Sequence, residues 1–135
     1  MPHSVHEQGT PEPVVPGEGL AVTAEALYIV NLLLLPGLAF IALLFVYLRY
    51  IRTAPALAVC HLRQTLSASI WAGVLLLLAN IIIVVLGGYR SPHTWMVVII
   101  YFTTCHATLV LLGVMGLAKA MAGQCFRYPL VGRPL

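Results

Sequence analysis

The charged residues of this chain are divided by sign along the sequence, and this division constrains the fold more than any other feature. All four acidic residues lie before position 26, and all seven basic residues lie after position 48. Three apolar runs without a charged residue occupy 27–48, 65–86 and 95–118. Soluble domains carry both signs over their surface, with about a quarter of their residues charged, whereas only 8% are charged here. The pattern therefore predicts a protein built around a lipid bilayer.

Each apolar run is long enough to cross the membrane, because a helix of about 20 residues spans the hydrocarbon layer. Lipid-exposed backbone must satisfy its own hydrogen bonds, which favours helices. We expect an all-α integral membrane protein with three transmembrane helices, the first of them kinked at Pro36 and Gly37. Residues 49–64 are too polar for lipid and too apolar for a free linker. We expect a short interfacial helix there, opened by Pro55 and running into the second crossing.

The basic residues also predict an orientation. Six of the seven lie either between the first two runs or after the third, and only Arg90 lies in the loop between the second and third. Loops rich in Lys and Arg stay in the cytoplasm. The prediction is an N-terminus outside and a C-terminus inside, in a membrane such as the bacterial inner (cytoplasmic) membrane.

The chain divides into an extramembrane tail at 1–24 and a transmembrane domain at 25–135. The tail is rich in Pro, Gly and Glu and cannot bury enough surface to fold alone, so we expect a partner protein to order it. His3, His6 and Glu7 form a possible weak metal-binding cluster in this tail. The favoured interpretation is a solvated tail without metal.

Small and polar residues fall on one face of the second run and on one face of the third. A short loop makes these two helices antiparallel neighbours, which places Ser69 opposite Gly113 and Asn80 beside Thr103. Helices in lipid associate through such small and hydrogen-bonding residues. The expected packing residues are Ser69, Gly73, Asn80, Thr103, His106 and Gly113.

His106 has two interpretations. As a packing residue, a neutral imidazole donates one hydrogen bond and accepts another. The alternative is axial ligation of a haem or a chlorophyll-type pigment. His61 lies about 22 Å away in depth, so the two cannot share one cofactor. The repeated pairs Cys60-His61 and Cys105-His106 are equally separated. We predict no metal site, no resident cofactor and a bound phospholipid, with a tetrapyrrole on His106 left open.

Other functional classes are disfavoured. No carboxylate follows Glu25, so an acid–base pair or a catalytic triad is not expected, and the chain is predicted not to be an enzyme. The basic residues are single and not interleaved with aromatic residues, unlike a nucleic-acid surface. Three cysteines without paired spacing do not indicate a disulfide framework. The expected partners are other integral membrane subunits and lipids, with no soluble small-molecule substrate.

Two short stretches carry a family resemblance. They are HLRQTL at 61–66 and AMAGQCFRYPLVG at 120–132. Over residues 58–133 the chain resembles the Tic-type membrane proteins, which are the channel component of chloroplast inner-envelope protein import and its small bacterial relatives of unassigned function. Those proteins show a His-x-Arg-Gln entry to a membrane helix and an Arg-Tyr-Pro exit. The resemblance implies a translocation or channel component.

Both stretches are expected at the cytoplasmic surface, where they either clamp the inner ends of the second and third helices or bind anionic lipid headgroups. The leading hypothesis is a non-catalytic accessory subunit of a larger integral membrane complex, such as a bioenergetic one. A Tic-like channel component and a pigment-binding protein using His106 are the alternatives. The residues expected in the clamp or headgroup site are His61, Arg63, Gln64, Arg127 and Tyr128.

Overall fold

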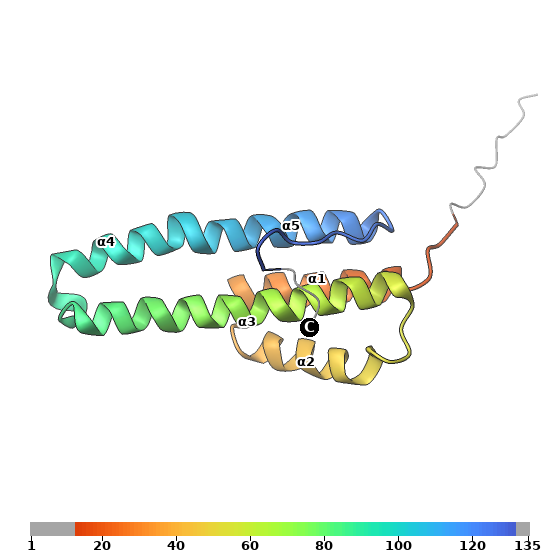
Figure 1. Cartoon of the computed structure of the whole chain (residues 1–135), viewed down its shortest axis with the longest axis horizontal. Coiled ribbons are helices and arrows are strands. Elements are labelled where there is room, and N and C mark those ends of the chain that lie inside the picture. The colour runs from red at the N-terminus through yellow and green to blue at the C-terminus, as the bar shows by residue number, and fades with distance from the viewer. Residues whose placement is uncertain (1–12, 132–135) are drawn as a thin grey trace, which may run out of the picture.

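The computed structural model describes residues 13–131, and the regular secondary structure of this part of the chain is entirely helical, without a strand. The all-α prediction is therefore confirmed. Successive helical limbs run in opposite directions (Figure 1). In chain order the elements are α1 (Glu18–Leu33), α2 (Leu38–Tyr50), α3 (Ala56–Val85), the 3-10 turn η1 (Gly88–Arg90), α4 (Pro92–Ile100), the π-helical segment η2 (Tyr101–His106) and α5 (Ala107–Met121).

The run at 27–48 does not form one kinked helix, and that prediction was wrong. The chain leaves α1 after Leu33 and enters α2 at Leu38. Pro36 has no N–H to continue a helical ladder, and Gly37 has a φ of +91°, a conformation that glycine adopts readily. The backbone N–H of Gly37 donates to Asn31 Oδ1 at 3.0 Å, which fixes the reversal. α1 and α2 therefore form a helical hairpin (Figure 1).

Among the helices within residues 13–131, two and not three are long and apolar enough to cross a membrane. They are Ala56–Val85 and the continuous limb Pro92–Met121, each of 30 residues. Only 22% and 11% of their most apolar windows are buried, unlike the core helices of a soluble protein, which are covered on most sides. The sequence prediction placed the acidic residues and the first basic residues on opposite sides of the membrane, with one crossing between them. The hairpin contradicts this, because the start of α1 and the end of α2 lie at the same end of the molecule (Figure 1).

Other predicted boundaries change as well. α1 begins at Glu18, so the second part of the predicted tail at 1–24 is helical. The expectation that Pro55 opens a helix running on into the second apolar run is confirmed, because Pro55 is the N-cap of α3. The residues after Pro55 are the first turns of α3 and not a separate helix within 49–64. The expectations for residues 1–12, including His3, His6 and Glu7, lie outside the described residues.

α1 lies at the centre of the bundle and packs against both α3 and α5, which contact each other far less. Ala24, Leu43 and Leu62 form one core cluster, joining α1, α2 and α3. Tyr28, Ala68 and Tyr128 form a second, which adds the segment after α5. The α1–α2 hairpin covers only the half of the long hairpin nearest the start of α3 (Figure 1). Beyond it α3 and α4 pair alone, and apolar side chains such as Val85, 79% exposed, face outward.

Candidate functional site

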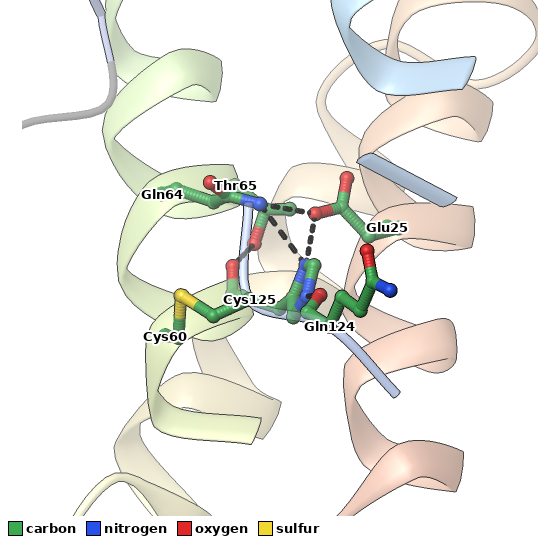
Figure 2. Close-up of a disulfide and its surroundings, with 7 residues drawn as sticks. Glu25, Cys60, Gln64, Thr65, Gln124 and Cys125 are labelled. Atoms are coloured by element: carbon green, nitrogen blue, oxygen red, sulfur yellow. Dashed lines mark hydrogen bonds and ion pairs between the residues drawn. A yellow bond between two sulfur atoms is a disulfide. The ribbon is translucent and has the colours of Figure 1, made fainter. Parts of the chain in front are cut away.

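A buried polar network lies where α1, α3 and the C-terminal segment meet. Glu25 of α1 and His61 of α3 are fully buried, and Oε1 of Glu25 lies 2.6 Å from Nδ1 of His61. Gln64, one turn further along α3, donates from Nε2 to the same Oε1 at 2.6 Å. The hydroxyl of Tyr128 donates to the other carboxylate oxygen of Glu25. Figure 2 shows Glu25 facing Gln64, with the hydrogen bond between them dashed.

The proton positions follow from the partners. Nε2 of His61 lies 3.0 Å from the carbonyl oxygen of Gln124, and a carbonyl can only accept, so Nε2 carries a hydrogen. Nδ1 of His61 also lies 3.0 Å from Nε2 of Gln64, an amide nitrogen that can only donate. One proton shared between Nδ1 and Oε1 leaves the His61–Glu25 pair neutral overall, whichever of the two atoms holds it.

Tyr128 anchors the chain after α5. Its side chain is 2% exposed, and burial, reinforced by the negative charge of Glu25, raises the pKa of its phenol above the usual value. Further along, the carbonyl of Val131 accepts from the Ser67 hydroxyl at 2.7 Å. The residues after α5 are therefore held against α1 through Tyr128 and against α3 through Val131.

Two glycines of α5 make room for this cluster. A Cβ atom at Gly116 would lie 2.5 Å from Oε2 of Glu25 and 2.5 Å from the Tyr128 hydroxyl oxygen. A Cβ at Gly113 would lie 2.8 Å from the ring of Tyr28, whose hydroxyl donates to the carbonyl of Leu109 at 3.1 Å. The absence of side chains at these two positions lets α1 approach α5 closely.

A disulfide joins the same two segments next to the network. Cys60 precedes His61, Cys125 follows Gln124, and their Cα atoms are 6.0 Å apart (Figure 2). The cysteine spacing did not predict this bond, because the two partners are 65 residues apart in the sequence. Cys105 is the free cysteine among the described residues.

The structure brings together part of the predicted clamp. His61, Gln64 and Tyr128 surround Glu25, so the two stretches that carry the family resemblance lie side by side. Arg127 is exposed. The buried Nε of Arg63 has no hydrogen-bond partner within the described part of the chain.

Sequence reasoning missed Glu25, which it assigned to the outer side of the membrane. A signal was present in the spacing of Ala21, Ala24, Glu25 and Tyr28, which places them on one helical face. All four are buried in α1. A carboxylate on a face of small and aromatic residues indicates a buried partner.

The predicted packing between the second and third runs requires correction, because at Gly113 helix α1 occupies the place where contact with Ser69 was expected. Gly113 faces Tyr28 and Ile29 of α1, not Ser69. Asn80 and Thr103 are exposed, and each bonds a carbonyl four residues earlier in its own helix.

A second feature is an apolar cavity of about 610 Å³ beside the hairpin turn. Asn31, Pro36 and Phe40 line it from the hairpin, Ser69 and Gly73 from α3, and His106 from η2. π-helical turns occur frequently at functional sites. The ring of His106 packs against Phe102, with centroids 5.2 Å apart.

The described residues hold no group of three or more His, Cys, Asp or Glu side chains suited to a metal ion. Both nitrogens of His61 are already within hydrogen-bond distance of protein atoms. His106 is the histidine that lines the cavity.

Comparisons of the chain with protein families, with curated proteins and with solved structures find no match. The resemblance to Tic-type proteins therefore stays a prediction.

Proposed function

We propose that this chain is a non-catalytic subunit of a larger integral membrane complex and acts by packing its helices against partner helices and lipid. The observation that carries this proposal is the uncovered outer half of the α3–α4 hairpin. Val84 is 73% exposed and Trp95 is 57% exposed, and no other element of residues 13–131 covers this half (Figure 1). In a bilayer such surface contacts either lipid or another subunit.

The buried network supports a structural role for the opposite half. Glu25 and His61 are fully enclosed, so a substrate does not reach them. A buried ion pair adds little stability over apolar residues of the same volume. We therefore propose that the buried network fixes the register of α1 against α3 and the C-terminal segment. A fixed register holds the outer half of the α3–α4 hairpin in one orientation.

The orientation that we propose places the basic end inside, with both termini in the cytoplasm of a bacterial inner membrane and the loop at Arg90 outside. This follows from the positive-inside rule applied to a chain whose hairpin returns to its starting side. Lasting disulfides are rare in the cytoplasm, so this orientation predicts that Cys60 and Cys125, which are bonded in the structure, are mostly reduced in the cell.

A photo-cross-linking amino acid at Val85 tests the proposal, with the same residue at Thr23 as control. Thr23 is exposed on α1 at the covered end of the molecule. We expect irradiated membranes to give an adduct with another integral membrane protein from Val85 and little from Thr23, matched by a heteromeric band in native electrophoresis. Adducts with lipid alone, together with a monomeric band, would contradict the subunit role.

A further inference from the structure

The cavity beside the hairpin turn contains a polar group without a partner. Ser69 lines the cavity, is 4% exposed, and its hydroxyl has no hydrogen-bond partner in residues 13–131. Buried hydroxyls without a partner cost free energy and are therefore uncommon. This hydroxyl indicates that something outside the described residues completes the site.

The cavity lies at membrane depth and not at the headgroup level. Ser69 is six residues beyond Arg63 and Leu77 is fourteen beyond it, so the cavity extends from about 9 to about 21 Å along α3. The stretch of α3 from Arg63 to Val85 measures about 33 Å on the same rise. The cavity is therefore centred near the middle of this stretch, where the acyl chains of a phospholipid carry no hydrogen-bonding atoms.

The other polar groups of the wall agree with this placement. Tyr101 and His106 of η2 add a phenol and an imidazole to the wall that also contains Ser69 of α3. Asn31 contributes its amide, whose oxygen already accepts from the Gly37 N–H. The remaining lining is apolar or aromatic. Apolar walls with a few polar groups characterise small-molecule sites, whose usual volumes are about 300–1,000 Å³.

We infer that this cavity binds an isoprenoid quinone, whose carbonyl oxygens accept hydrogen bonds from the polar wall groups while its ring and tail occupy the apolar remainder. A quinone carries hydrogen-bond acceptors into the hydrocarbon layer, as the depth of Ser69 requires. The inference depends on the proposed membrane placement but not on a partner subunit.

Gly73 provides the sharpest variant. It lines the cavity, and a Cβ added there meets no atom within 4 Å, so we expect the larger side chain of Gly73→Leu to occupy part of the cavity. Ser69→Ala removes a hydroxyl that has no protein partner, so it leaves the fold intact. Asn80→Leu is the matched control, because Asn80 is exposed on the same helix about 10 Å further along.

The experiment uses the full chain, purified from membranes and placed in phosphatidylcholine nanodiscs. Solvent extracts are assayed for quinone by absorbance, and a decyl-substituted benzoquinone is titrated while the Tm is followed. We expect quinone in the extracts and a rise in Tm. Apparent affinity should fall more than tenfold in Gly73→Leu and about five- to tenfold in Ser69→Ala, the loss of one hydrogen bond, and be unchanged in Asn80→Leu.

Extracts that hold phospholipid alone with no shift in Tm would overturn the inference, as would a tetrapyrrole spectrum or wild-type affinity in Gly73→Leu. Resistance of the chain to alkaline extraction from membranes is measured separately. A chain that stays in the membrane but fails the titration contradicts the quinone site alone, whereas a chain released by alkali contradicts the membrane placement itself.

Discussion

Oε1 of Glu25 and Nδ1 of His61 lie 2.6 Å apart in the fully buried centre of the bundle. The two residues belong to different helices, α1 and α3, and meet only because the chain reverses between α1 and α2. The contact between Glu25 and His61 therefore depends on the α1–α2 hairpin and on the buried network around the two residues.

Replacing either member of this pair should destabilise the protein strongly. Glu25→Leu leaves the ring of His61 buried without its partner at Nδ1, and His61→Leu leaves the carboxyl group of Glu25 buried without its partner at Oε1. Each single change should lower the free energy of unfolding by about 3–5 kcal/mol, whereas the double variant should recover most of that loss. Denaturant titrations of wild type, the two single variants and the double variant in detergent micelles measure this double-mutant cycle. Strictly additive losses would show that the two residues do not interact.

Replacing Gly116 of α5 and Gly73 of α3 by alanine should change the stability of the chain in different ways. Gly116→Ala places a methyl group 2.5 Å from the Glu25 carboxylate and the Tyr128 hydroxyl, so it should cost about 1–3 kcal/mol as overpacking. Gly73→Ala meets open space and should be neutral or stabilise α3 by up to about 1 kcal/mol. Thermal melting of the two variants under identical conditions compares them. An unchanged Tm in Gly116→Ala would contradict the close packing.

Tyr128→Phe should remove a hydrogen bond to a charged acceptor and cost about 1.5–3 kcal/mol at neutral pH. Because the pKa of Tyr128 is raised in the folded chain, the phenol ionises first in the unfolded chain, near pH 10. Ionisation of the unfolded chain lowers the stability of wild type above that pH, so the difference between wild type and Tyr128→Phe should narrow there. Arg127→Ala, at an exposed neighbour, should keep the wild-type profile. A difference that stays constant up to pH 11 would argue against a buried phenol.

Reduction of the Cys60–Cys125 bond should destabilise the chain. Closing a loop of 65 residues corresponds to about 4 kcal/mol in the chain-entropy description. Chemical denaturation with and without a reductant measures the loss, and Cys105→Ser should behave like wild type in both. Equal stability of the oxidised and reduced proteins would mean that the bond does not constrain the unfolded chain.

The helical class and the two long limbs were predictable because an apolar run in lipid has few alternatives to a helix. The hairpin was not, since Pro36 and Gly37 are locally compatible with a kink or with a full reversal. What decides between them is tertiary packing. Ala24 of α1 packs against Leu43 of α2 and Leu62 of α3 in one buried cluster, and this cluster forms only when the chain reverses between α1 and α2.

The network was only partly predictable for the same reason. The motif around His61 and Gln64 and the segment at Tyr128 were expected to meet at one membrane surface. Glu25 was assigned to the opposite surface because the run after it was counted as one crossing, and its role depends on the reversal. The packing of Gly113 differed because α1 occupies the space where α3 and α5 were expected to touch.

The most direct test of the account asks whether Glu18 and Arg52 lie on the same side of the membrane. Each is replaced by cysteine in a chain whose own three cysteines are changed to alanine, and sealed vesicles of known orientation are treated with a membrane-impermeant maleimide. The hairpin predicts that both positions are labelled from the same side. Labelling of one position from each side would restore a single crossing between them and contradict the fold.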